Sequence, residues 1–163
     1  MVKNVFASVR RLNFVQKELM TQEIYRNVGD IYSFVSAVNQ AEKLANDLIR
    51  EDHILRREGS EKLYLSALEK CNQRLGKERD TLAKAMGNYA ATVGIYDRIH
   101  LHETKKLIGK VQREMPDKLV SPIKLSVLVL EKVESTDAIL KKVCTTQKNW
   151  EATIIKKKLD KKE

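Results

Sequence analysis

Apolar residues recur every three or four positions from about residue 15 to residue 115, and charged residues occupy most of the positions between them. This spacing is typical of amphipathic helices, because residues three and four apart share one helix face. No proline occurs between Met1 and Met115, and the glycines stand singly along the chain. The pattern therefore predicts an all-α protein of long helices, each of which buries a narrow apolar stripe against another helix.

Short interruptions divide the chain into three predicted helices. The first runs from about residue 14 to residue 55, and Gly59 either ends it or is passed at a cost of about 1 kcal/mol relative to alanine. The second runs from residue 60 to about residue 115, before Pro116, and the third begins at Pro122, since proline suits a first helical turn. The apolar stripe predicted for the third helix consists of Ile123, Val127, Leu130, Val133, Leu140, Val143, Trp150 and Ile154.

The second predicted helix carries apolar residues seven positions apart, a spacing that favours a left-handed supercoil with partner helices. At 1.5 Å per residue this helix would be about 80 Å long. A rod this narrow buries too little surface alone, so we expect three long helices in an antiparallel coiled-coil bundle that forms a homodimer. The residues predicted to form the core or the dimer contact are Leu68, Leu75, Leu82, Tyr89 and Tyr96.

Charge is concentrated at the two ends of the chain. The formal net charge is +9, and residues 141–163 alone hold eight lysines against three acids. Basic ends suit an anionic surface, either lipid headgroups or nucleic acid, although solubility alone also explains lysine-rich ends. The predicted division is a basic amphipathic segment over residues 1–14, a helical coiled-coil domain over residues 15–155, and a lysine-rich tail over residues 156–163 that frays into solvent.

The first fourteen residues combine apolar side chains at helical spacing with the cations Lys3, Arg10 and Arg11, and they contain no acid. Three interpretations stay open for this segment. It inserts into a membrane interface as a short amphipathic helix, it serves as a mitochondrial targeting segment, or it simply forms the first turns of the first helix.

No arrangement of residues that supports catalysis or holds a cofactor or metal is found. His100 and His102 are two positions apart and so point in different directions on a helix, which prevents them from sharing one metal ion. Cys71 and Cys144 form no spaced pair, which indicates a reducing compartment. No apolar run approaches the roughly 20 residues of a membrane span. We therefore expect a protein without enzymatic activity or cofactor, cytoplasmic or peripheral to a membrane, and nucleic acid is disfavoured because aromatic residues are not interleaved with the lysines.

Three segments of the predicted helices carry a resemblance to a known family. Residues 23–48 read EIYRNVGDIYSFVSAVNQAEKLANDL, residues 65–93 read LSALEKCNQRLGKERDTLAKAMGNYAATV, and residues 96–111 read YDRIHLHETKKLIGKV. These segments resemble the BAR-domain superfamily, most closely the Chibby-interacting BAR-domain family. The likeness extends over about residues 15 to 115. The family's proline near the bend of its second helix has no counterpart, and Gly94 is the nearest residue at which the helix could bend.

The resemblance implies a homodimeric scaffold that binds anionic membranes at the ciliary base or centriole, during cilium assembly, and recruits a small coiled-coil partner such as Chibby. It also implies an association with mitochondria. Taken singly, each of these cations is more simply explained as an ordinary solvated helix charge. The alternative function is a cytoskeletal, axonemal or secretion-apparatus coiled-coil adaptor that binds no lipid. The candidate lipid-binding residues of the helices, which add to Lys3, Arg10 and Arg11, are Lys70, Arg74, Lys77, Arg79, Lys84, Arg98, Lys105, Lys106 and Lys110.

Overall fold

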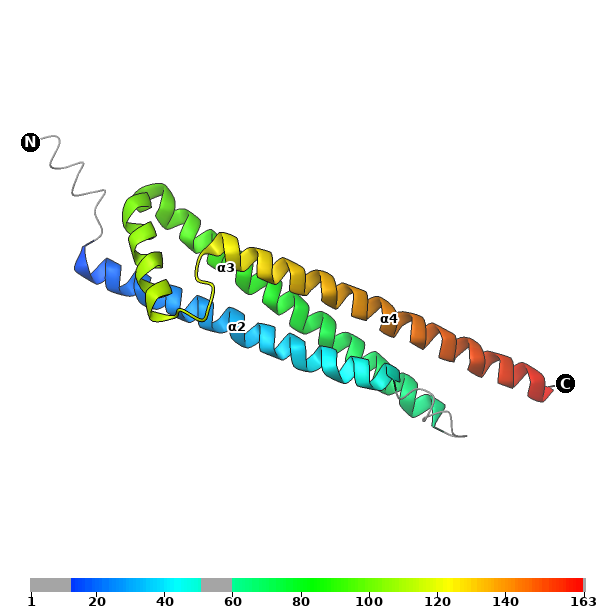
Figure 1. Cartoon of the computed structure of the whole chain (residues 1–163). Coiled ribbons are helices and arrows are strands. Elements are labelled where there is room, and N and C mark those ends of the chain that lie inside the picture. The colour runs from blue at the N-terminus through cyan, green and yellow to red at the C-terminus, as the bar shows by residue number, and fades with distance from the viewer. Residues whose placement is uncertain (1–12, 51–59, 163) are drawn as a thin grey trace, which may run out of the picture. The chain divides into compact units, whose positions relative to one another are not determined.

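The computed structural model of the chain describes residues 13–50 and 60–162. Three helices occupy these residues, α2 (Phe14–Arg50), α3 (Glu61–Glu114) and α4 (Pro122–Lys162), and the described residues contain no strand (Figure 1). The all-α prediction is confirmed. The end predicted for the first helix at residue 55, the break at Gly59, and residues 1–12 of the predicted amphipathic segment lie outside the described residues.

The helix starts follow from local sequence. Asn13 caps α2, since its side-chain Oδ1 accepts from the Gln16 amide at 2.8 Å while the Gln16 side chain accepts from the Asn13 amide at 3.2 Å. Ser60 precedes α3, and its carbonyl accepts from the Tyr64 amide at 2.9 Å. Pro122 is the first residue of α4, as predicted, because a proline there removes only an amide that has no intrahelical partner.

Two predictions about helix continuity are wrong. The second helix is broken at His100, where φ is −134° and ψ is 44°, and the bend does not lie at Gly94. The lysines after residue 155 were expected to fray, but α4 continues through Lys162.

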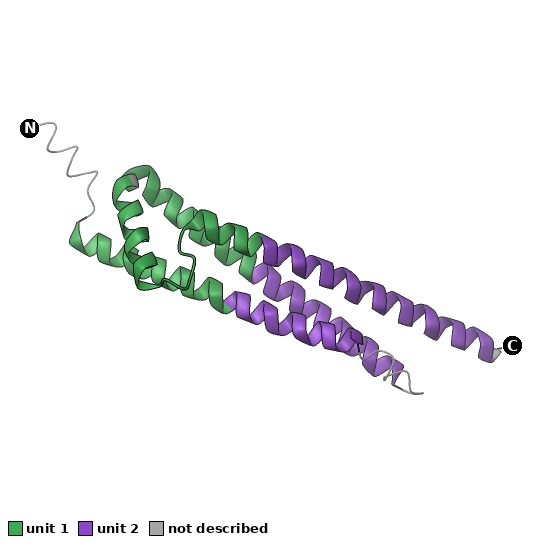
Figure 2. Ribbon diagram, in the orientation of Figure 1, with its two compact units in different colours: residues 1–33, 82–130 green, residues 34–81, 131–163 purple. Residues whose placement is uncertain are grey.

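The chain divides into two compact units (Figure 2). Within the described residues, unit 1 comprises 13–33 and 82–130, and unit 2 comprises 34–50, 60–81 and 131–162. Each unit contains part of α2, α3 and α4, and each has its own buried core.

In unit 2, α3 and α4 are antiparallel neighbours. Contacts pair Glu61 with Lys157 at 3.2 Å and Asn72 with Cys144 at 3.7 Å, so residue numbers rise along one helix as they fall along the other. The aromatic ring of Tyr64 lies 5.1 Å from that of Trp150, and both residues are buried. Apolar burial along this pair of helices supplies most of its stabilisation.

In unit 1, the break at His100 adds a fourth helical segment, because α3 turns back on itself (Figure 1). The buried hydroxyl of Tyr89 donates to the carbonyl of Val120 at 2.6 Å, which brings the chain after the turn back beside α3. The connection to α4 is fixed by Gln112, whose side chain donates to the Lys118 carbonyl at 2.7 Å and accepts from the Val120 amide at 3.0 Å. No proline or glycine pair lies at His100 to account for the break, and the hydrogen bond of Tyr89 to Val120 holds the returning chain beside α3.

Candidate functional site

The predicted core residues of α3 are buried by helices of the same chain. Leu68 and Leu75 in unit 2 and Leu82 and Tyr89 in unit 1 have no solvent exposure. Tyr96 is only half-buried, and burial, together with the charge and hydrogen bond of Glu23, raises the pKa of its hydroxyl. Since one copy covers the first four residues completely, a contact between two copies must use other side chains.

The apolar stripe predicted for the third helix is wrong in its first half. Ile123, Val127 and Leu130 are 77%, 53% and 57% exposed. The buried face of α4 consists instead of Leu125, Val129, Thr136, Val143 and Trp150. The start of α4 is apolar at almost every position, so periodicity could not select the buried face, and only the partners available in unit 1 decided it.

Three of the candidate lipid-binding cations share one face of α3 in unit 2. Lys70, Arg74 and Lys77 follow an i, i+4, i+7 spacing, and all three are exposed. None of them forms an ion pair with another residue that the structure describes. Their charges are therefore available to an anionic surface.

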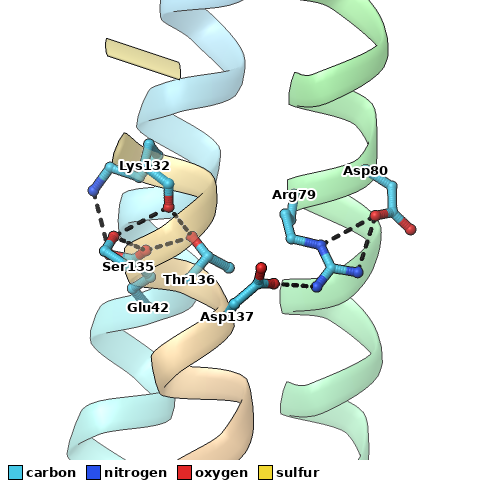
Figure 3. A network of polar contacts seen from close by, with 7 residues as sticks. All are labelled: Glu42, Arg79, Asp80, Lys132, Ser135, Thr136 and Asp137. Atoms are coloured by element: carbon cyan, nitrogen blue, oxygen red, sulfur yellow. Dashed lines mark hydrogen bonds and ion pairs between the residues drawn. The ribbon is translucent and has the colours of Figure 1, made fainter. Parts of the chain in front are cut away.

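Arg79 belongs to an interhelical ion pair rather than to this row. Its guanidinium donates to Asp137 on α4, and it also contacts Asp80 at 3.1 Å (Figure 3). The hydrogen bond to Asp137 is the main cause that raises the pKa of Arg79. The prediction that Arg79 faces lipid is therefore at odds with its contacts, because two carboxylates already hold its charge.

A second polar contact in unit 2 was missed by sequence reasoning. Glu42 on α2 accepts hydrogen bonds from Thr136 at 2.7 Å and from Lys132 and Ser135 at 3.4 Å, all three on α4 (Figure 3). The signal in the sequence was Thr136 itself, which stands seven residues from both Val129 and Val143 and so occupies a core position. A buried hydroxyl at such a position requires a partner, and two acceptors lie 2.7 Å from it, the Glu42 carboxylate on α2 and the Lys132 carbonyl on α4.

The other candidate cations lie in unit 1, on both sides of the break at His100. Lys84 and Arg98 precede the break, and the side chains of both are exposed. Lys105, Lys106 and Lys110 follow it and are also exposed. The break places these cations on two helical segments of different direction, so the single row expected along an unbroken helix does not form. Arg113, which sequence reasoning omitted, shares a face with Lys106 and Lys110 and is exposed.

The remaining predictions concern the N-terminal cations, metal binding, membrane spans and the two cysteines. Lys3, Arg10 and Arg11 lie outside the described residues. No group of three metal-binding side chains occurs in the part of the chain that the structure describes. Among the described helices, none offers an apolar stretch long enough for a bilayer crossing. Cys71 and Cys144 are free thiols, and burial raises the pKa of Cys71.

No protein-family model matches the chain, and neither a curated protein nor a solved structure is similar to it. The likeness to BAR domains therefore rests on the three sequence segments alone. The class that the structure defines is an all-α protein whose helices pack around two buried cores and carry rows of exposed cations.

Proposed function

We propose that the protein is a non-enzymatic, BAR-like scaffold that pairs with a second copy and binds anionic membranes. The observation that carries the proposal is the row of Lys70, Arg74 and Lys77. These side chains are exposed, and none of them forms an ion pair with an acidic residue that the structure describes. Each cation near an anionic leaflet contributes about 1 kcal/mol, so three cations on one face contribute about 3 kcal/mol per copy. Two copies would present the row twice.

The pairing of copies, in this proposal, uses the exposed face of α4. Ile123, Val127 and Leu130 form an apolar row at i, i+4, i+7 spacing that is more than half exposed. Such a row on a helix surface is typical of a helix–helix contact. The complete scaffold would be a three-helix antiparallel coiled-coil bundle in each copy, and by its likeness to the BAR family it would act at the ciliary base or on mitochondria and recruit a small coiled-coil protein such as Chibby.

Vesicle co-sedimentation tests the lipid contact. The full chain is mixed with vesicles of phosphatidylcholine alone and of phosphatidylcholine with phosphatidylserine. We expect binding only to the anionic vesicles, with an affinity that falls as salt is raised. The triple variant Lys70→Glu, Arg74→Glu, Lys77→Glu should bind them at least about 100-fold more weakly, since about 3 kcal/mol is lost.

The matched control reverses the same number of charges on another exposed surface of unit 2. The variant Lys141→Glu, Lys142→Glu, Lys148→Glu changes exposed lysines of α4 and should keep most of the binding. Equal losses for the two triple variants would contradict a dedicated face on α3. An absence of binding at low salt would contradict the membrane proposal itself.

Sedimentation equilibrium tests the pairing. We expect a concentration-dependent dimer for the natural chain and a monomer for the variant Val127→Asp, Leu130→Asp, because charges on an apolar contact lose hydration without a partner. A natural chain that stays monomeric at every concentration would contradict the pairing.

The second candidate function is a coiled-coil structural or adaptor protein that binds no lipid. The exposed row of Val127 and Leu130 favours it, because the same row suits a helix of another protein. This function predicts that the Val127→Asp, Leu130→Asp variant loses association while neither charge-reversal variant has any effect on vesicles.

A further inference from the structure

A groove of about 450 Å³ opens in unit 1 beside the break in α3. One wall consists of Ala90, Val93 and Gly94 before the break, and the opposite side is formed by Ile108 after the break and by Pro122 and Ile123 at the start of α4. A volume of this size is typical of sites that hold small organic molecules. The walls are mostly apolar, and two serines, Ser121 and Ser126, and two charged residues, Asp97 and Lys105, complete the lining.

The groove exists because small residues stand where a core would require large ones. Ala90 is exposed, and a side chain added at Gly94 would meet no atom within 4 Å. The turn at His100 carries the chain away and back again, and the Tyr89 contact with Val120 holds the start of α4 on the far side. Neighbouring helical segments are thus fixed close to a space that none of their side chains fills.

Asp97 supplies the polar character of the groove. Its Oδ1 atom is shielded from solvent and accepts no hydrogen bond from any residue the structure describes. A buried acceptor without a donor destabilises the folded chain, and more so when it carries charge. Because Oδ1 is shielded, a ligand would reach the carboxylate of Asp97 through its other oxygen, and no ion pair with a described residue neutralises that carboxylate. Asp97 therefore favours a ligand that brings a positively charged donor.

Lys105 lines the same groove but does not satisfy Asp97, since no ion pair joins them. The side chain of Lys105 is exposed, so its ammonium group can stay in water when a ligand enters. Asp97 has a shorter side chain and is partly buried, so its carboxylate stays at the groove. The carboxylate, rather than the lysine, sets the charge that the groove selects.

We propose that this groove binds an amphiphilic amine, a small molecule with an apolar body and a protonated amino group. The apolar body packs against Ile108, Pro122 and Ile123, and the ammonium group donates to the carboxylate of Asp97. The groove shares Ile123 with the apolar row proposed for pairing, whereas Lys70, Arg74, Lys77, Val127 and Leu130 line no part of it.

Isothermal titration calorimetry with three probes of equal chain length tests the proposal. Octylamine, 1-octanol and octanoate are each titrated into the full chain, at concentrations where none of them forms micelles or droplets. We expect octylamine to bind at least about tenfold more tightly than octanol, as a hydrogen bond to a charged group requires, and octanoate to bind weakest. Equal binding of octylamine and octanol, or no binding of octylamine, would overturn the proposal.

Two variants separate the charge from the cavity. Asp97→Asn should lower octylamine binding to the level of octanol and leave octanol unchanged. Gly94→Leu should abolish the binding of octylamine and octanol, because the new side chain occupies the groove. The matched control is Gly87→Leu, at an exposed glycine of the same helix that also has open space around it and lies outside the groove.

The control variant should bind octylamine as the natural chain does, and circular dichroism should show unchanged helix content for all three variants. Loss of binding in Gly87→Leu as well as in Gly94→Leu would place the amine elsewhere. Retention of the preference for octylamine in Asp97→Asn would exclude the carboxylate as its partner.

Discussion

Unit 1 and unit 2 are built from parts of the same three helices, yet they use them differently. In unit 2, α2 and α3 each contact α4 through polar side chains, at Glu42 and at Arg79. In unit 1, a break in α3 creates an additional helical segment and leaves a groove. One buried row of α3 runs through both units, with Leu68 and Leu75 in unit 2 and Leu82 and Tyr89 in unit 1, and all four side chains are fully buried. The comparison shows that a regular buried row fixes which residues of a helix are covered, but not whether the helices around it fill all the space.

The reason lies in the residues opposite that row. In unit 2, α4 presents Trp150, whose large ring lies 5.1 Å from the ring of Tyr64 and fills the space beside it. In unit 1, the exposed side of α3 has Ala90 and Gly94, which are too small to reach the neighbouring segments. Packing density in a protein core is uniformly high, so a region lined by small residues either collapses or stays open to solvent. The contact of Tyr89 with Val120 keeps it open.

The largest effect is expected from truncating the buried row in either unit. Leu75→Ala in unit 2 and Leu82→Ala in unit 1 should each lower the free energy of unfolding by about 3 kcal/mol, because both side chains have no exposure and leave a cavity. Urea denaturation measures both values. Leu63→Ala, at a residue that is 75% exposed, is the control and should change the free energy of unfolding by less than about 0.5 kcal/mol. A much smaller cost for Leu82→Ala would show that unit 1 relaxes into the cavity and that unit 2 does not.

A smaller effect is expected from removing the polar contact peculiar to unit 2. Glu42→Ala should lower the free energy of unfolding by about 2 kcal/mol, since Lys132 loses its carboxylate partner in a mostly buried position. Urea denaturation of Glu42→Ala, Lys132→Met and the double variant gives the coupling energy. Glu131→Ala, at an exposed acid of α4, should have little effect. The absence of coupling between Glu42 and Lys132 would remove this distinction between the units.

The tyrosine hydroxyls give a matched pair, one in each unit. Tyr89 donates to Val120 at 2.6 Å and Tyr64 donates to Leu48 at 2.9 Å. Tyr89→Phe and Tyr64→Phe should each lower the free energy of unfolding by about 1 kcal/mol, because a mostly buried main-chain carbonyl loses its donor. Thermal or urea unfolding at neutral pH measures both.

The pH dependence of stability sharpens the same comparison. Burial raises the pKa of Tyr89 above its ordinary value of 10.0. The folded chain therefore keeps the Tyr89 proton where the unfolded chain loses it, so the contribution of Tyr89 is complete below pH 10 and is lost as pH rises through the folded-state pKa. The free energy of unfolding, measured on both sides of pH 10, should fall more steeply for the natural chain than for Tyr89→Phe. Identical slopes would show that Tyr89 is not sealed from water.

The smallest effect is expected for the ion pair of Arg79 and Asp137. Asp137 is nearly half exposed, at 47%, so water screens the interaction. A double-mutant cycle with Arg79→Ala and Asp137→Ala should give a coupling energy of about 0.5 kcal/mol, which declines in high salt. A coupling energy larger than that of Glu42 with Lys132 would reverse the order of the two polar contacts in unit 2.

Much of the fold followed from the spacing of apolar residues. The starts of the second and third helices at residues 60 and 122 were predicted close to their positions, because serine and proline act on the first helical turn alone. The burial of Leu68, Leu75 and Leu82 was also predicted, since residues seven apart share a helix face whatever surrounds it. The exposed state of Lys70, Arg74 and Lys77 agrees with their place on the opposite face.

The candidate sites depended more on contacts between distant residues. The pairing of Arg79 with Asp137 joins residues 58 apart, and nothing near Arg79 in the sequence distinguishes it from Lys77. The groove depends on the position of Asp97 relative to Pro122 and Ile108, which no local pattern encodes.

The sequence by itself determined that the chain is helical, where the helices begin, and which face of α3 is buried, because these properties depend on residues within one or two turns of each other. Only the tertiary structure decided that α3 breaks at His100 and that α4 buries Leu125 and Val129 rather than Ile123 and Val127. Both outcomes depend on contacts such as that of Tyr89 with Val120, which lie 31 residues apart. Such contacts add free energy only after the chain has folded back on itself, so no local pattern of residues specifies them.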